Sequence, residues 1–147
     1  MKYEFLYEAI KEAKLAKAEG EVPVGAVIVK DDKIIASAHN LKEKLKKTSA
    51  HAEMLAIELA AKSLSNWRLN GCEMYVTLEP CPMCAACICQ SRLSKIYIGT
   101  FDPVSGACGS VINLMQNEYL KYHTDVEWLY SDECSNILKD FFKRRRV

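Results

Sequence analysis

The sequence predicts an α/β fold with three layers, in which a mixed central sheet of about five strands carries helices on both faces. Three observations predict it. Short β-branched runs alternate with longer amphipathic segments. A tight turn separates the first two runs, as in an antiparallel hairpin, whereas later runs are joined by crossovers long enough for parallel pairing. No repeat or linker-like stretch interrupts the chain, so residues 1–147 are expected to form a single domain.

The N-terminal half is expected to hold two helices around a hairpin. Apolar residues recur at helical spacing up to Gly20, which tolerates the positive φ of a helix C-terminus. A second helix follows a lysine-rich loop and is expected to use Thr48 or Ser49 as its N-cap. The expected elements are a helix over 3–19, strands over 22–29 and 34–36 around a turn at 31–33, and a helix through 50–60.

The C-terminal half is expected to alternate strands and helices. Glu79-Pro80 ends the first of these strands, because proline has no N–H to donate to a sheet. Ser131, Asp132 and Glu133 favour the N-terminus of a last helix. The expected elements are strands over 74–78, 95–99 and 126–130, a compact helical segment over 82–92, and a final helix that runs from 131–133 into the basic C-terminus.

Composition excludes several classes of protein. The chain has 20 Lys and Arg against 19 Asp and Glu, whereas a protein that coats nucleic acid is strongly basic. No apolar run approaches the roughly 18 residues that span a bilayer, and the N-terminus is amphipathic rather than a signal peptide. We therefore expect a soluble, cytoplasmic protein with no membrane partner.

The cysteines indicate a metal site or a reactive thiol. There are seven, an odd number, and four of them fall between residues 81 and 89. A secreted disulfide scaffold usually spaces an even number of cysteines along a shorter chain. Clustered cysteines in a cytoplasmic protein favour metal binding instead.

Two motifs stand at the expected starts of two helices, His51-Ala52-Glu53 and Pro80-Cys81-Pro82-Met83-Cys84. If both helices begin at one edge of the sheet, His51, Cys81 and Cys84 converge on one ion, and Zn²⁺ prefers imidazole and thiolate ligands. Three protein ligands are typical of a catalytic zinc site, whose fourth position holds a water with a pKa of about 7. Glu53 can move protons for this water. We therefore expect one Zn²⁺ per subunit, Glu53 as the catalytic residue, and no organic cofactor.

Two other metal sites are possible on these residues. Cys81, Cys84, Cys87 and Cys89 superficially resemble an iron–sulfur run, but the last spacing differs from the ferredoxin pattern, and proline precedes the run rather than following it. A structural zinc module that binds RNA or protein would need a fourth ligand, for which Cys87 is the candidate. Otherwise Cys87 and Cys89 are expected to be small buried helix residues.

The order His51-Ala52-Glu53, then Pro80-Cys81-x-x-Cys84, matches the signature of zinc nucleobase deaminases. Further motifs extend the match over essentially the whole chain, which resembles the tRNA-specific adenosine deaminase family. The resemblance implies a cytidine-deaminase-like fold, a homodimer, and hydrolytic deamination of adenosine to inosine at the wobble position of a tRNA anticodon stem-loop. The further motifs lie at 20–26, 38–40, 67–69, 75–81, 91–92, 102–103, 106–107, 109–110 and 140–142.

The resemblance also implies roles for residues outside the metal site. Asn40 would hydrogen-bond the flipped-out base, the backbone around Ala52 would help to read the base edge, and Asp102 would contact the neighbouring nucleotide. Val104 stands where many relatives carry a lysine, so one phosphate contact is expected to be missing. Thr48 stands where a proline is often found, which leaves its loop less rigid.

Two basic segments favour RNA binding independently of the resemblance. Lysines crowd residues 42–47, and the chain ends with Phe142 beside a basic run of Lys143, Arg144, Arg145 and Arg146. Basic residues next to an aromatic ring suit phosphate contact and base stacking. The zinc chemistry does not by itself separate such a substrate from a free base, nucleoside or nucleotide, such as guanine, cytosine or deoxycytidylate. The C-terminal run is the feature that favours RNA.

Overall fold

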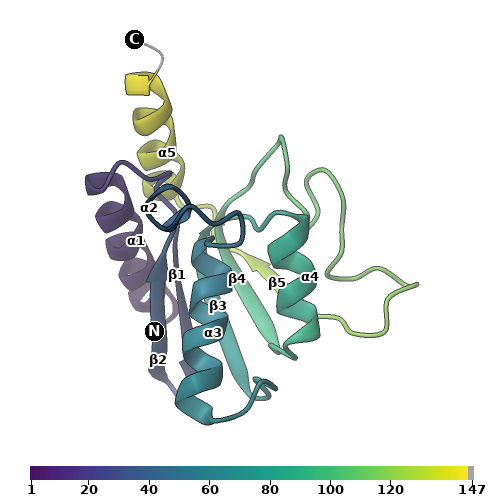
Figure 1. Ribbon diagram of the computed structural model, residues 1–147. Helices are drawn as coiled ribbons and strands as arrows, with labels where there is room; N and C mark the ends of the chain where they lie inside the picture. The colour runs from purple at the N-terminus through teal and green to yellow at the C-terminus, as the bar shows by residue number, and fades with distance from the viewer. Residues whose placement is uncertain (146–147) are drawn as a thin grey trace.

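A computed structural model describes residues 1–145 of the chain (Figure 1). No helix in this range is both long and apolar enough to cross a membrane. The elements are, in order, α1 (Lys2–Ala18), β1 (Gly25–Lys30), β2 (Lys33–His39), α2 (Lys42–Leu45), α3 (Ala52–Leu64), β3 (Cys72–Leu78), α4 (Pro82–Gln90), β4 (Lys95–Thr100), β5 (Asp125–Trp128) and α5 (Asp132–Arg145).

The five strands form one mixed sheet in the order β2-β1-β3-β4-β5. β1 is antiparallel to β2 and β3, whereas β3, β4 and β5 run parallel, as a hairpin followed by crossovers requires. In the parallel pair Leu78 lies opposite Thr100, so β3 and β4 end at the same edge of the sheet. The segments that follow these two strands therefore meet at that edge, where ligands of open α/β sheets usually bind.

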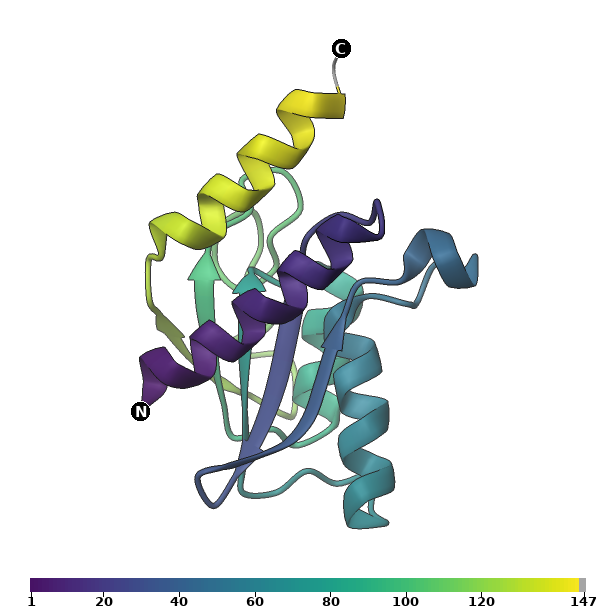
Figure 2. The same cartoon turned by 90° about the vertical axis from the view of Figure 1, so that its left-hand side faces the viewer.

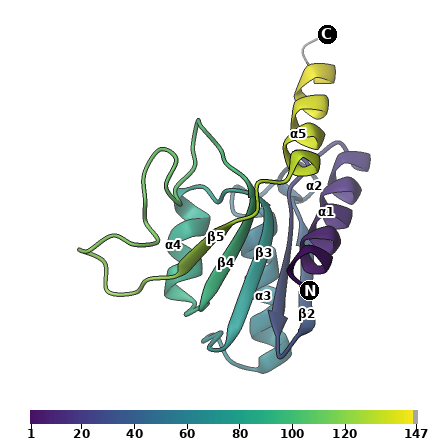
Figure 3. The same cartoon turned by 180° about the vertical axis from the view of Figure 1, so that it is seen from behind.

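Helices cover both faces of the sheet, which confirms the three-layer α/β prediction. α3 and α4 pack on one face, and α1 and α5 lie on the other (Figures 1 and 2). β1 alternates between the two layers: Val27 and Val29 pack with α1, whereas Ala26 and Ile28 belong to the core beneath α3. Seen from behind, β5 forms one edge of the sheet, and a long segment between β4 and β5 loops out near α4 (Figure 3).

α1 approaches the sheet closely at Gly25. A Cβ atom at this position would lie 2.0 Å from the carbonyl oxygen of Ala9, so a larger residue does not fit without moving the helix. His39 lies opposite Gly25 in the β1–β2 register, and its Nδ1 atom is 2.8 Å from Oε2 of Glu12 on α1. α1 thus holds the end of β2, immediately before Asn40.

The structure differs from the expected elements at several ends. α3 continues to Leu64, β3 begins at Cys72, and β5 ends at Trp128 rather than at residue 130, because Tyr130 has a positive φ of 50°. The N-cap of α3 is His51 rather than Thr48 or Ser49, because residues 47–50 form a turn in which the N–H of Ala50 donates to the carbonyl of Lys47 (3.1 Å). Part of the lysine-rich loop forms the one-turn helix α2. Residues 22–24 precede β1 instead of extending it, and β2 continues to His39.

Candidate metal centre and active-site pocket

The side chains of His51 and Cys81 stand at the first positions of two neighbouring helices. His51 is the N-cap of α3, with φ −77° and ψ 152°, and Cys81 is the N-cap of α4, with φ −73° and ψ 173°. Neither side chain caps its own helix by a hydrogen bond, so both remain free to bind something else. Pro82 occupies the first helical turn of α4, where its missing N–H costs nothing. Cys84 follows in the same turn.

The three expected ligands converge in the structure. The Nδ1 atom of His51 lies 3.7 Å from Sγ of Cys81 and 3.5 Å from Sγ of Cys84, and all three ligand atoms lie within 4.8 Å of one another. Tetrahedral Zn²⁺, with Zn–N of about 2.0–2.1 Å and Zn–S of about 2.3 Å, would set its nitrogen and sulfur ligands about 3.6 Å apart. The donor atoms and their spacing therefore fit one zinc ion.

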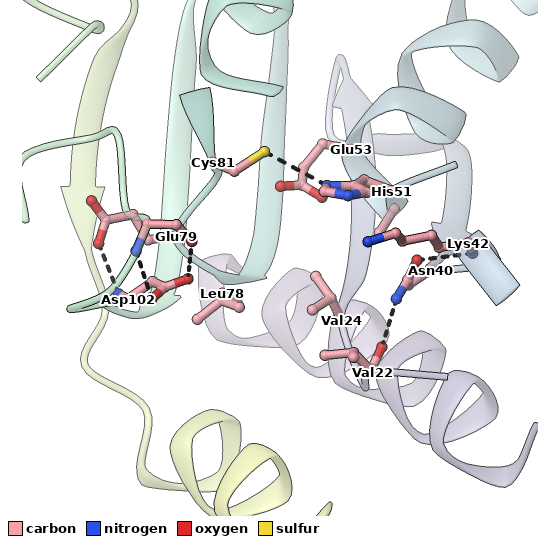
Figure 4. Close-up of a pocket in the computed structure, with 12 residues that line it drawn as sticks. Val22, Val24, Asn40, Lys42, His51, Glu53, Leu78, Glu79, Cys81 and Asp102 are labelled. Atoms are coloured by element: carbon pink, nitrogen blue, oxygen red, sulfur yellow. Dashed lines mark hydrogen bonds between the residues drawn. The ribbon is translucent and has the colours of Figure 1, made fainter. Parts of the chain in front are cut away.

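The electrostatics of the site favour a cation beside thiolate. Hydrogen bonding with Cys84 lowers the pKa of the Cys81 thiol to about 4, and the same interaction raises the pKa of Cys84. The positive ends of the α3 and α4 dipoles also favour anionic sulfur here. Glu53, in the first turn of α3, is only 4% exposed, and burial raises the pKa of its carboxyl to about 7. Its carboxyl group lies beside the His51 ring (Figure 4).

A cavity of about 210 Å³ is lined by His51, Glu53 and Cys81. The three substrate-binding residues that the resemblance implies also line it: Asn40, Ala52 and Asp102. Val22, Val24 and Leu78 supply apolar walls (Figure 4). The side chain of Asn40 is held in place at the rim: its Nδ2 donates to the carbonyl of Val22 (3.3 Å), and its Oδ1 accepts from the N–H of Lys42 (3.1 Å).

Asp102 stands on the opposite rim and orders its own turn. Its Oδ1 accepts hydrogen bonds from the N–H groups of Val104 (2.9 Å) and Ser105 (3.2 Å), and its Oδ2 accepts from the Ser105 hydroxyl (2.9 Å). The N–H of Asp102 donates to Oε1 of Glu79 (2.9 Å). Val104, where a phosphate contact is expected to be missing, is 84% exposed at this rim.

A larger groove of about 960 Å³ continues from the pocket toward α5, and Val22, Leu78, Asp102 and Ser105 line both. Phe142 and Lys143, two of the four expected RNA contacts, line the groove. The other two expected contacts lie elsewhere: Arg144 is 3.7 Å from Asp140, and Arg145 donates to the carbonyl of Gly20. Arg146 falls outside the described residues.

The remaining cysteines of the cluster do not join the metal ligands. Within residues 1–145, His51, Cys81 and Cys84 are the one group of His, Cys, Asp and Glu side chains placed to hold a metal. Sγ of Cys87 lies 3.8 Å from Oγ of Ser91, and Sγ of Cys89 lies 3.6 Å from Sδ of Met115. Cys89 is buried as expected, whereas Cys87 is only partly buried. This geometry favours neither an iron–sulfur cluster nor a structural zinc module with Cys87 as its fourth ligand.

Comparison with known proteins agrees with this site. Residues 1–100 match the cytidine and deoxycytidylate deaminase zinc-binding region. Over 143 residues the chain is 48% identical to a tRNA-specific adenosine deaminase of Bacillus subtilis, covering 97% of this chain and 89% of the relative. The chain belongs to the tRNA-specific adenosine deaminase family.

Two further similarities extend over the same length. A tRNA-specific adenosine deaminase of Aquifex aeolicus is 46% identical over 142 residues, which cover 97% of this chain and 94% of the relative. A solved structure from a study of A-to-I editing by tRNA:A34 deaminases at the wobble position of transfer RNA superposes with a TM-score of 0.89 at 39% identity, covering 92% of this chain and 99% of that one. The cytidine-deaminase-like α/β fold and the single-zinc site expected for this family therefore apply to the chain.

Sequence reasoning missed several pocket residues of this deaminase. The apolar walls Val22, Val24 and Leu78 were assigned only to strands or their flanks. The sequence marks Glu79, which is 2% exposed, as the end of a strand and as part of the 75–81 motif, but assigns it no role in the pocket. The signal that could have identified it is a glutamate at the end of an apolar strand, directly before Pro80-Cys81, where a buried charge needs a structural reason.

Proposed function

We propose that this protein hydrolyses adenosine to inosine at the wobble position of a tRNA anticodon loop and releases ammonia. The observation that carries the proposal is a three-ligand zinc site, with Glu53 beside it, in a pocket that continues into a groove lined by Phe142 and Lys143. The relatives named for this activity align over 97% of the chain, which supports the same substrate here.

His51, Cys81 and Cys84 would hold the zinc ion. When bound, zinc supplies Lewis-acid chemistry that lowers the pKa of a water molecule from 15.7 to about 7. Glu53 then carries two protons in turn. Its carboxylate would accept the first from the attacking water and deliver it to the purine ring nitrogen. It would then take the second from the hydroxyl formed at the ring carbon and deliver it to the amino group, which leaves as ammonia. Its buried position beside His51 keeps the carboxylate on the reacting side of the pocket (Figure 4).

The pocket rims would bind the base and its neighbour. Asn40 presents an amide whose geometry is already held by Val22 and Lys42, so it can hydrogen-bond a flipped-out base without ordering first. The buried backbone at Ala52 lines the same cavity and would read the base edge. Asp102 lines both pocket and groove, which supports a contact with the nucleotide next to the bound base.

The groove toward α5 would hold the anticodon loop. Phe142 is 45% exposed and provides a stacking surface, while Lys143 on the same helix provides a positive charge for phosphate. Arg144 and Arg145 lie outside the groove lining, so their contribution would be long-range attraction rather than direct contact.

We also propose that the protein acts as a homodimer. α4 contains no charged residue, and a helix that is apolar on all sides is normally buried on all sides. In the single chain, however, Met83 and Ala86 on α4 remain partly exposed, and the long segment before β5 exposes Val111 and Ile112. A second copy of the chain would cover this surface. Sedimentation of the protein and of an Ala86→Arg variant tests the arrangement, because an arginine there would dissociate the dimer.

Residues 1–147 would act as one deaminase domain in the cytoplasm. All seven cysteines are free thiols in the structure, which suits a reducing compartment. The proposed substrate, tRNA, belongs to the same compartment.

The deciding experiment incubates the zinc-loaded protein with an anticodon stem-loop that carries adenosine at the wobble position. Parallel reactions contain free guanine, cytosine, adenosine or deoxycytidylate. We expect inosine in the stem-loop and no turnover of the small molecules. Turnover of a small molecule with an unedited stem-loop would contradict the proposal and favour a deaminase of free bases, nucleosides or nucleotides.

A further inference from the structure

One buried carboxylate fastens the rim that carries Asp102. Glu79 is 2% exposed, and its Oε1 accepts from the N–H of Asp102 (2.9 Å), while its Oε2 accepts from the N–H groups of Cys108 (2.9 Å) and Ser110 (3.1 Å). The hydroxyl of Ser110 donates to the same carboxylate. Within residues 1–145 no lysine, arginine or histidine forms an ion pair with Glu79. The loop N–H and O–H donors therefore compensate for burying the charge.

Glu79 is also close to the metal site along the chain. Glu79 precedes Pro80 and Cys81, and the carbonyl of Pro80 accepts a hydrogen bond from the N–H of Ala107 (2.9 Å). Gly106 makes room for the carboxylate, because a Cβ atom there would lie 2.3 Å from its Cδ. The loop of residues 102–110 is thus folded around the Glu79 side chain. Both Glu79 and the carbonyl of Pro80, the two residues directly before the ligand Cys81, hold this loop in position.

The hydrogen bonds of Glu79 hold the Asp102 rim in a fixed position relative to the segment that carries Cys81. Asp102 orders residues 104 and 105 with its own carboxylate, but its backbone position depends on the bond from its N–H to Glu79 (Figure 4). A rim held this way keeps its shape before substrate arrives, which reduces the ordering cost of binding. Without the Glu79 contacts, the Asp102 carboxylate would still be present, but its backbone would no longer be held in one position.

We propose that Glu79 is a positioning residue that sets the Asp102 rim relative to Cys81 and thereby determines discrimination at the nucleotide next to the edited adenosine. This inference rests on the proposed function, in which Asp102 contacts that nucleotide. Glu79 touches neither the reacting base nor the metal in this role; it acts through Asp102.

A second buried glutamate on the opposite rim provides a matched control. Glu21 is 1% exposed, and its carboxylate accepts from the N–H groups of Glu43 (3.0 Å) and Lys44 (2.8 Å) at the start of α2. Both glutamates bind backbone N–H groups of a rim segment, but the Glu21 segment adjoins Asn40 and Lys42 rather than Asp102. A general effect of losing a buried carboxylate would appear in variants of both residues.

The experiment compares the parent with the Glu79→Gln, Glu21→Gln and Asp102→Ala variants and with the Glu79→Gln/Asp102→Ala double variant. The substrates are stem-loops that differ only in the nucleotide before or after the wobble adenosine, and the readout is the ratio of their kcat/KM values. A glutamine amide has one acceptor oxygen and turns its NH₂ donors toward the loop N–H groups, so several bonds are lost. We expect the Glu79→Gln variant to retain zinc and to lose the parent's neighbour preference by roughly tenfold.

The other variants distinguish an effect on the position of Asp102 from general damage to the fold. We expect the Glu21→Gln variant to keep the parent ratio and the double variant to show no further loss beyond Asp102→Ala, because both changes remove one coupled contact. If Glu79→Gln does not fold, Ser110→Ala removes one donor to the same carboxylate and is expected to shift the ratio in the same direction by a smaller factor. A Glu79→Gln or, failing that, a Ser110→Ala variant with the parent ratio would overturn the inference.

Two parent results distinguish this inference from the proposed function. A parent protein that edits no stem-loop overturns the proposed function. A parent that edits the stem-loop but does not discriminate at either neighbour overturns the role of Glu79 alone.

Discussion

Sγ of Cys84 lies 3.5 Å from Nδ1 of His51, although the two residues belong to different helices and are 33 positions apart in sequence. Cys87, one helical turn after Cys84, bonds to Ser91 instead. The metal site therefore depends on where two helices begin and not on how many cysteines α4 contains. This distinction can be measured directly.

We predict that a Cys84→Ala variant loses zinc, whereas a Cys87→Ala variant retains one zinc per chain. Removing one of three ligands leaves too few donors to hold the ion against a chelator, while Cys87 contributes no ligand atom. Atomic emission after dialysis against a mild chelator gives the metal content of both variants and the parent. Loss of zinc from Cys87→Ala would show that the site is closed by a fourth ligand.

Glu53 separates catalysis from binding. A Glu53→Gln variant keeps the shape of the side chain but does not carry a proton, so we predict that kcat falls by about 10²–10⁴. Zinc content and stem-loop affinity should remain near those of the parent, because Glu53 is not among the three metal ligands. Single-turnover kinetics and fluorescence anisotropy measure the two quantities.

The control for this prediction is Glu58→Gln on the exposed face of the same helix. It changes the charge of α3 equally without reaching the pocket, and we expect parent kinetics. A Glu53→Gln variant that turns over at the parent rate would remove Glu53 from the mechanism.

Gly25 limits which residues the fold accepts beneath α1. We predict that Gly25→Ala lowers the free energy of unfolding by about 2–3 kcal/mol, the upper part of the range for overpacked cores, because the added Cβ meets the helix backbone rather than a flexible side chain. Urea unfolding followed by circular dichroism measures the change.

Gly71, with φ +76° and nothing within 4 Å of a Cβ, is the comparison: Gly71→Ala should cost only about 1 kcal/mol of backbone strain. Equal costs at the two positions would show that α1 moves aside without penalty.

The sequence predicts the layers of this fold well because its signals there are local. The hairpin and the parallel crossovers follow from alternation, turn residues and the lengths of the connections, and the structure confirms them. The metal ligands were also predictable, since His51 and the Cys81–Cys84 pair each stand at a helix N-terminus. The ends of the elements were less certain: His51 caps α3 because the preceding turn closes on Lys47, a contact that no single-residue preference reveals.

Long-range contacts explain what the sequence did not predict. Glu79 is identifiable as a buried carboxylate only once the loop of residues 102–110 is seen folded around it, 23 to 31 positions away. The basic C-terminal run behaves similarly. Lys143, Arg144 and Arg145 are alike in charge, but the helical twist of α5 and its packing against α1 place only Lys143 in the lining of the groove.

That twist leads to a prediction about RNA binding. Lys143 lines the groove, whereas Arg144, the next residue, lies outside it near Asp140. We predict that Lys143→Gln raises KM for the stem-loop several-fold and reduces the salt dependence of binding by about 0.7–0.9 in the slope of log K against log [salt], the amount expected for one lost phosphate contact. Phe142→Ala should weaken binding by about 1–3 kcal/mol through lost stacking, with the salt slope unchanged.

Arg144→Gln is the matched control for Lys143→Gln: it removes the same charge at the next helix position, and its slope should stay close to that of the parent. Fluorescence anisotropy titrations of a labelled stem-loop at four or five salt concentrations provide the slopes. If Arg144→Gln lowers the slope as much as Lys143→Gln does, the RNA does not follow the groove between the pocket and α5, and the contact is a diffuse attraction to the whole C-terminal helix.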